Sequence, residues 1–210
     1  LELEEIKTII LAHLSGINEE KILYGSYTEE EEERVARAAQ IMIDYKENLH
    51  LEQIADPNVG RLKSVVRRHA NQNKIKYVFY DYIFTSPNLL SEFRDIKVRE
   101  DVALGLLSAA LKDLATELGV FVMSATQLSG DYENVKTAKT QTLLRGAKSI
   151  ADKVDVGAIV SPVAKEDLIM LDSVIKTIQC VPPTIVTDVY KLRRGRYKGV
   201  RIWSVMDLGT

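Results

Sequence analysis

The chain has 210 residues, of which 46% are hydrophobic and 28% charged, and its formal net charge is −2. A chain of this length and composition can bury a sizeable core, which argues against a disordered protein. The near-neutral charge gives no overall attraction to nucleic acid, so any DNA-binding surface must come from local clusters of basic residues.

The single cysteine, Cys180, and the absence of a long apolar run restrict the compartment. One cysteine cannot form an intrachain disulfide, and no cysteine–histidine cluster has the spacing of zinc ligands. No apolar stretch is long enough for a bilayer span, and the acidic start differs from a signal sequence. We therefore expect a cytoplasmic protein with no membrane partner. The first residue is Leu1 rather than methionine, which suggests a fragment.

Two helices are predicted in the first 45 residues. Apolar residues recur at helical spacing from Leu3 to Leu14, and Gly16 suits a left-handed cap. Thr28 is a typical N-cap, and the glutamates at 29–33 lie where the helix dipole favours negative charge. This acidic run therefore requires no binding partner.

A strand, a helix and a second strand are predicted next. The alternation from Leu49 to Gln53 indicates a short strand, and Pro57 with Asn58 opens a helix. The apolar run from Tyr77 to Tyr80 is typical of a central strand in a parallel sheet that is covered on both faces.

Alternation of helices and strands continues to the end of the chain. A helix is predicted from about Val98 to Leu118, with Gly119 as its stop. Four further strands are predicted, at Val120–Ala125, Val154–Val160, Thr184–Val189 and Val200–Val205. The pattern predicts one α/β domain over residues 1–210, with three layers and a mostly parallel central sheet.

Two segments interrupt this alternation. Residues 127–143 are largely polar and follow the end of a strand, where doubly wound folds place their ligand loops. Residues 162–183 are interpreted as an insertion, which contains an amphipathic helix from Ala164 to Ile178.

Asp81 and Gln127 are the polar residues with which two predicted strands end. An aspartate in this position can hold Mg²⁺ beside nucleotide phosphates, as in a Walker B strand, and a glutamine can sense a γ-phosphate. Each residue taken alone also fits a plainer role, the aspartate as a loop cap and the glutamine as a loop amide.

The segment Lys191-Leu-Arg-Arg-Gly-Arg196 is a cluster of basic residues at the end of a predicted strand. Lys191 and Arg193 are two apart on an extended chain, so they project to the same side and can place two cations on one triphosphate. A charged edge hairpin that discourages aggregation is the competing interpretation.

Taken in order, these segments resemble the helicase domain of DnaB-type replicative DNA helicases from Leu11 almost to the end of the chain. The most specific match is a gap-free Leu-Arg-x4-Ile-x3-x-Asp-Val spacing over residues 144–156. The other matching segments are Leu11–Asn18, Thr28 onwards, Tyr77–Tyr82, Arg99–Glu100, Leu111–Leu118, Val122–Leu128 and Lys191-x-Arg193-x-Gly195.

The resemblance implies a RecA-like fold and an ATP- and Mg²⁺-dependent motor that translocates on single-stranded DNA and unwinds duplex. Asp81 would be the metal-linked carboxylate and Gln127 the phosphate sensor. Lys191 and Arg193 would complete the ATP site of a neighbouring subunit, which makes hydrolysis depend on subunit contact. Glu2 is the candidate for the catalytic glutamate, although it also fits a solvated first-turn residue.

The resemblance also implies partners. Arg145, Gly146 and Lys148 would grip the phosphates of single-stranded DNA, and residues 127–143 would face that DNA. The subunits would form a homo-oligomeric ring, a hexamer by analogy, that works with a primase and a helicase loader in the bacterial cytoplasm.

Departures from the family pattern leave two alternatives. No G-x-x-x-x-G-K-[ST] loop occurs, so these residues alone should bind ATP poorly and be inactive, as a domain truncated at its N-terminus. Gln127 is followed by leucine rather than asparagine or serine, and the insertion indicates a divergent, phage-type member. The alternatives are a RecA- or RadA-like recombinase and a degenerate RecA-like module that binds DNA without ATPase activity.

Overall fold

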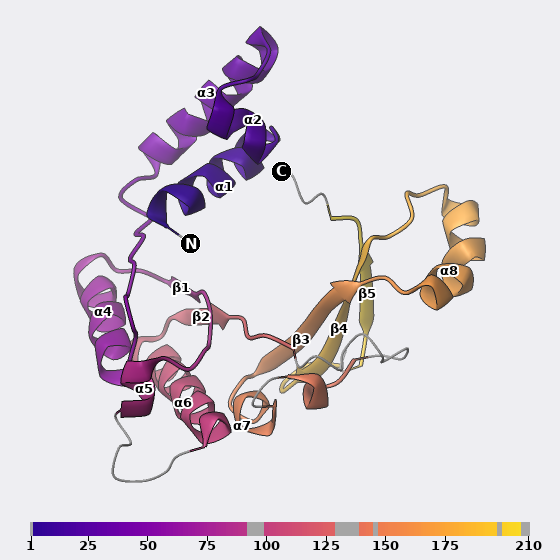
Figure 1. The fold of residues 1–210 in the computed structure, drawn as a ribbon. Coiled ribbons are helices and arrows are strands. Elements are labelled where there is room, and N and C mark those ends of the chain that lie inside the picture. Colours follow the sequence, from indigo (N-terminus) through magenta and orange to yellow (C-terminus); the bar gives the residue numbers. More distant parts are fainter. Residues whose placement is uncertain (1, 92–98, 129–138, 145–146, 197–198, 207–210) are drawn as a thin grey trace. The chain divides into compact units, whose positions relative to one another are not determined.

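The computed structural model describes residues 2–91, 99–128, 139–144, 147–196 and 199–206 (Figure 1). The described chain forms two compact units. An N-terminal unit contains the residues up to Ala55, and a main unit runs from Asp56 to Met206. The extent of a single domain over residues 1–210 stays a prediction.

Three helices make up the described N-terminal unit: α1 (Leu3–Ser15), α2 (Glu19–Tyr24) and α3 (Glu29–Asp44). α1 ends as predicted at Gly16, whose φ of 65° lies in the left-handed region. The Thr28 side chain accepts from the Glu31 amide, and the Glu31 carboxylate accepts from the Thr28 amide, so the predicted N-cap of α3 is confirmed.

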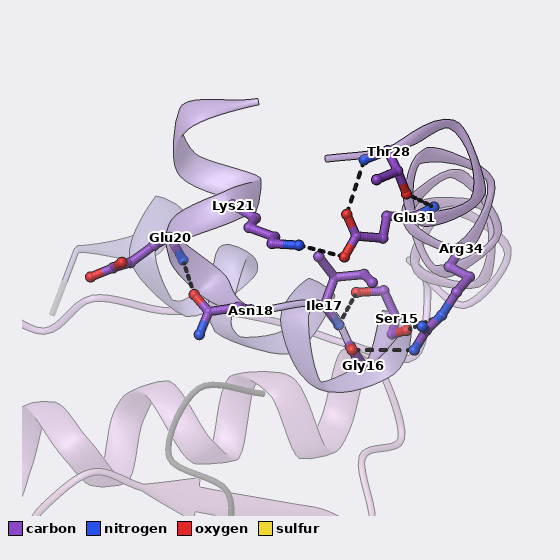
Figure 2. Close-up of polar contacts among 9 residues, drawn as sticks. All are labelled: Ser15, Gly16, Ile17, Asn18, Glu20, Lys21, Thr28, Glu31 and Arg34. Atoms are coloured by element: carbon purple, nitrogen blue, oxygen red, sulfur yellow. Dashed lines mark hydrogen bonds and ion pairs between the residues drawn. The ribbon is translucent and has the colours of Figure 1, made fainter. Parts of the chain in front are cut away.

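Side chains of α2 and α3 tie these helices together, as Figure 2 shows. Arg34 of α3 donates to the carbonyls of Ser15 and Gly16, at 3.0 and 3.2 Å, and so binds the end of α1. Lys21 of α2 forms a 2.6 Å ion pair with Glu31. This ion pair and its hydrogen bonds lower the pKa of Glu31.

The strand predicted from Leu49 to Gln53 is wrong. These residues have no regular secondary structure, and Leu49 is exposed. A strand needs a neighbour that completes its hydrogen bonds, and the described part of the N-terminal unit contains only helices.

The main unit begins with an α/β segment: α4 (Val59–Gln72), β1 (Tyr77–Tyr80), α5 (Pro87–Ser91), α6 (Glu100–Leu118) and β2 (Phe121–Ser124). β1 and β2 pair in parallel, Tyr77 with Phe121 and Tyr80 with Ser124. α6 packs against α4 and β2, and it buries one continuous apolar face that includes Leu104, Leu107 and Leu114. Gly119 ends α6 in the left-handed region, as predicted.

The expectation that both faces of β1 are covered is wrong for the described chain. Only alternate residues are shielded, while Tyr77 and Phe79 are 66% and 71% exposed. Phe121 and Met123 of β2 are exposed as well, because the parallel register places them opposite these two residues. The apolar run therefore predicted a strand correctly but not its burial.

The second half contains η2 (Gln141–Leu143), α7 (Ala147–Ala151), β3 (Val156–Pro162), α8 (Lys165–Ile178), β4 (Ile185–Leu192) and β5 (Arg201–Ser204). These three strands form an antiparallel sheet in the order β3-β4-β5. The α/β class is confirmed, but the mostly parallel central sheet is not, since β1–β2 is the one parallel pairing among the described strands. The β4–β5 connection is too short for the crossover that parallel neighbours require.

The predicted amphipathic helix is confirmed as α8, which joins β3 to β4 (Figure 1). Arg201 of β5 anchors it, because its guanidinium binds both carboxylate oxygens of Asp167 on α8 at 2.8 and 3.0 Å. Arg201 also binds Asp188 of β4 at 2.9 Å. Whether residues 162–183 are an insertion stays a prediction.

Candidate functional site

The carboxyl ends of β1 and β2 bring Asp81 and Gln127 into the same region. Strand pairing ends at Tyr80 and Ser124, and the Ser124 hydroxyl donates to the Tyr80 carbonyl at 2.6 Å. The chains then continue side by side, since the Ile83 amide donates to the Ala125 carbonyl at 2.9 Å. Parallel neighbours in this topology bring their strand-end residues to one edge of the sheet.

A hydrogen bond connects Gln127 to the residue that follows Asp81. The Gln127 side-chain amide donates to the Tyr82 hydroxyl at 3.2 Å, and Tyr82 directly follows Asp81. The Tyr82 ring also packs on Phe84, with ring centroids 5.5 Å apart. Tyr82 ends the matching segment Tyr77–Tyr82, but its hydrogen bond with Gln127 was not predicted, because a contact 45 residues distant leaves no local signal.

The chemistry of this edge fits a nucleotide-bound Mg²⁺. The Asp81 side chain is exposed and can accept a ligand. Within the described residues, no group of three or more histidine, cysteine, aspartate or glutamate side chains is arranged to hold a metal. Mg²⁺ at nucleotide sites commonly takes one or two carboxylates together with phosphate oxygens and water, so a single aspartate is sufficient.

Tyr80, at the end of β1, has a different environment from Asp81. Burial raises the pKa of its hydroxyl to about 12, and that hydroxyl has no hydrogen-bond partner among the described residues. The phenol therefore stays neutral at physiological pH. Tyr80 contributes packing, and the charge at this strand end comes from Asp81.

The predicted cations Lys191 and Arg193 contact the carboxyl end of α7 and the residue that follows it. Lys191 Nζ donates to the Ala151 carbonyl at 2.5 Å. Arg193 Nη2 donates to the Asp152 carbonyl at 3.4 Å, and Nη1 lies 3.2 Å from Asp155 Oδ1.

Asp155 also pairs with Lys112 of α6, a contact that the sequence did not predict. The hydrogen bond from Lys112, together with the charges of Lys112, Arg193 and Arg194, lowers the pKa of Asp155. Asp155 is part of the gap-free spacing over residues 144–156, which was the available signal for its importance. Lys112 could not be paired with it from sequence, since 43 residues separate them.

α7 is packed closely against α6. A side chain at Gly105 of α6 would bring its Cβ to 2.7 Å from the Ser149 Cβ, so only glycine fits there without displacement. The Ser149 hydroxyl donates to the Asp101 carbonyl at 2.6 Å. These contacts fix the helix whose end meets Lys191 and Arg193.

The predicted DNA-binding residues lie mostly outside the part of the chain that the structure describes. Arg145 and Gly146 lie outside it, as does the Lys148 side chain, although the Lys148 backbone belongs to α7. Residues 129–138 of the predicted DNA-facing loop also lie outside it. The described end of that loop, including Lys139 and Gln141, lines a cavity of about 340 Å³ with Asp188 and Tyr190 of β4.

Glu2 lies in the N-terminal unit at the start of α1. Its amide donates to the Glu5 carboxylate at 2.6 Å, and its side chain is exposed. This is the plainer first-turn environment that the sequence also allowed. Its catalytic role stays a prediction.

Comparison with known proteins identifies a family over nearly the whole chain. The family model described as DnaB-like helicase C terminal domain matches residues 1–203. The SPbeta prophage-derived uncharacterized protein YorI of Bacillus subtilis (strain 168) is 33% identical over 214 residues, which cover 99% of this chain and 42% of YorI. The replicative DNA helicase DnaB of Buchnera aphidicola subsp. Acyrthosiphon pisum (strain APS) is 29% identical over 133 residues, which cover 62% of this chain and 27% of DnaB.

Solved structures share the fold at lower identity. A DnaB-like replicative helicase, described with its interactions with primase, superposes with a TM-score of 0.75 at 16% identity and covers 100% of this chain and 47% of its own. A second solved structure, described as an ATPase domain, gives a TM-score of 0.70 at 18% identity, with 99% of this chain and 72% of its own covered. The resemblance to DnaB-type helicases is thus confirmed, and the chain spans less than half the length of the curated relatives named here.

No helix within the described residues is both long and apolar enough to cross a bilayer.

Proposed function

The chain belongs to the DnaB-like helicase C-terminal domain family, and from that premise we propose that it is part of a replicative DNA helicase motor. The motor couples ATP hydrolysis at subunit interfaces to translocation on single-stranded DNA and to duplex unwinding. The observation that carries the proposal is the position of Asp81 and Gln127 just beyond the paired ends of β1 and β2, where Gln127 donates at 3.2 Å to the hydroxyl of Tyr82, the residue that follows Asp81.

In this proposal Asp81 holds the Mg²⁺ of a bound ATP and Gln127 contacts its γ-phosphate. Bound Mg²⁺ neutralises charge that develops on the phosphates during transfer. The Gln127 amide cannot keep its Tyr82 contact unchanged if it turns toward a phosphate. Loss of the γ-phosphate therefore alters the environment of the residue next to Asp81.

Lys191 and Arg193 act on the nucleotide of a neighbouring subunit, and Glu2 is the candidate general base. A cation supplied from a second subunit stabilises transition-state charge only when the subunits are in contact, so catalysis belongs to the assembly. These 210 residues contain no glycine-rich phosphate loop, and we expect them to bind ATP weakly and to be inactive without one.

The DNA and protein partners are part of the same proposal. Arg145, Gly146 and Lys148 bind phosphates of single-stranded DNA in the channel of a homo-oligomeric ring, a hexamer by family analogy. A primase and a helicase loader are further partners, and the cytoplasm of a bacterial cell is the compartment. The prophage origin of YorI supports a phage-type member of the family.

DNA-stimulated ATPase activity of the complete gene product tests this function. We expect Asp81→Asn and Arg193→Ala each to reduce turnover at least about 100-fold, since each removes charge stabilisation from phosphoryl transfer. Asp172→Asn is the matched control, because it removes a carboxylate from an exposed ion pair with Lys176 on α8 and should leave activity unchanged.

Mixing the two inactive variants tests whether Arg193 acts across an interface. In a random equimolar ring, about a quarter of the interfaces combine an intact Asp81 with an intact Arg193, so activity should partly return. No recovery would refute action in trans. Strand exchange without unwinding would instead favour a recombinase, and a folded protein with DNA binding but no ATPase would favour the degenerate module.

A further inference from the structure

Lys191 and Arg193 both bind oxygen acceptors of their own chain in the described structure. These acceptors are the Ala151 and Asp152 carbonyls and the Asp155 carboxylate. We infer that the acceptors of Arg193, the Asp155 carboxylate and the Asp152 carbonyl, form a resting site that holds this cation until it moves to the phosphates of a neighbouring subunit's nucleotide. The inference rests on the proposed function and adds Asp155 and Lys112 as positioning residues.

The resting site and a phosphate compete because they offer the same chemistry. Both terminal nitrogens of Arg193 are directed at acceptors of its own chain, so they must leave these acceptors to form a bidentate contact with a phosphate of another subunit. Arg193 therefore has two alternative sets of partners. The apparent affinity for nucleotide falls as the fraction of subunits with Arg193 held in the resting site rises.

Arg193 is held loosely enough to leave. Its two side-chain contacts are 3.2 and 3.4 Å long, whereas close charge-assisted pairs are about 2.7–2.9 Å. Its side chain is also 50% exposed. The contrasting arrangement in this chain is the bidentate pair between Arg201 and Asp167, whose side chains are only 22% and 10% exposed and which anchors secondary structure.

The main chain near Arg193 does not have to move with the side chain. The Arg193 amide donates to the Asp155 carbonyl at 2.9 Å, and Leu192 pairs with Val156 across β3 and β4. These bonds fix the base of the arginine. Release then needs only changes of side-chain rotamer, which are fast compared with ATP turnover.

Lys112 determines how strongly Asp155 retains Arg193. It binds Asp155 Oδ2, while Arg193 approaches Oδ1, so the carboxylate keeps one cation when the arginine leaves. Without Lys112, departure of Arg193 would leave the carboxylate without either of its described cation partners. Loss of Lys112 should therefore strengthen the resting contact, and loss of the Asp155 charge should abolish it.

The test is the dependence of ATPase rate on ATP concentration, in the complete gene product with saturating single-stranded DNA. We expect Asp155→Asn to lower KM by about two- to fivefold, the range of an exposed ion pair, with kcat within about twofold. Lys112→Met should raise KM. Asp155→Glu, which restores the charge, should return KM toward the wild-type value, and Asp172→Asn should change neither constant.

Opposite shifts of KM distinguish a resting site from a structural role. If the Asp155–Lys112 pair merely supported the fold, both variants would change activity in the same direction, and that result would overturn the inference. A fall in kcat with Asp155→Asn like that of Arg193→Ala would also overturn it, by making Asp155 part of the working arrangement. If Arg193→Ala lowers turnover while KM is unchanged in Asp155→Asn, the proposed function survives and the resting site fails. Full activity of Arg193→Ala would refute both the proposed role of Arg193 and the resting site.

Discussion

Replacement of Arg201 by methionine should destabilise the main unit more than the loss of an ordinary surface ion pair. Arg201 binds Asp167 through two hydrogen bonds and Asp188 through a third, and all three lie between 2.8 and 3.0 Å. Its guanidinium also lies 4.5 Å from the ring centroid of Trp203, a favourable cation–π distance. Methionine keeps most of the aliphatic volume and removes the charge.

The magnitude follows from the burial of the two partners. The side chains of Asp167 and Asp188 are only 10% and 3% exposed, so Arg201→Met leaves two shielded carboxylates without their cation. Removal of one member of a buried pair costs about 3–5 kcal/mol, which in a chain of this size lowers Tm by roughly 6–20 °C. The stability of Arg201→Lys should lie between those of the wild type and Arg201→Met, because lysine keeps the charge but lacks the planar guanidinium that binds a carboxylate through two hydrogen bonds.

Thermal unfolding by circular dichroism measures the loss, and hydrogen exchange over residues 165–178 locates it at α8. The control combines Arg201→Met with Asp167→Asn and Asp188→Asn, which removes the uncompensated charges and should recover most of the stability. A loss below about 1 kcal/mol for Arg201→Met alone would refute the reasoning, since that is the effect of an exposed pair.

Two further predictions concern the N-terminal unit. Gly16 and Gly25 both have positive φ, but a Cβ at Gly16 would lie 2.6 Å from Arg34 Nη2, whereas nothing lies within 4 Å at Gly25. Gly16→Ala should therefore lower the free energy of unfolding by about 0.5–1.5 kcal/mol more than Gly25→Ala does. Equal losses of stability in urea denaturation would show that the contacts of Arg34 contribute nothing. The hydrogen bond from Lys21 lowers the pKa of Glu31, so its stabilisation is complete above the ordinary glutamate pKa and is lost as pH falls through the lowered value. The stability difference between wild type and Glu31→Gln should shrink in acid, and a difference independent of pH would contradict the ion pair.

Local features of the fold were predictable, whereas pairing and burial were not. Gly16, Thr28 and Gly119 act within one or two turns of their own helix, so short sequence patterns identified these helix ends. The direction of strand pairing depends on partners far along the chain. β4 extends to Leu192, beyond the predicted end at Val189, because Lys191 and Leu192 pair with β3.

In the candidate site, too, the features set by local sequence were predictable and those set by distant contacts were not. The proximity of Asp81 and Gln127 follows from parallel neighbouring strands, which the sequence could indicate. The bond from Gln127 to Tyr82 depends on how two loops leave the sheet, and no spacing rule reports that geometry. The basic segment predicted two cations on one side of a strand but not that their own chain supplies acceptors for both.

The gap-free spacing over residues 144–156 has a physical reason in these contacts. At one end, Leu144 is buried, forms a bridge with Leu128 and packs in a cluster with Ala151 and Ile159. At the other end, Asp155 must reach the cations of α6 and of the residue that follows β4. An inserted residue would shift either the buried leucine or the carboxylate out of place. We therefore expect this segment to tolerate substitution more readily than a change of length, because its two ends are fixed by different parts of the main unit.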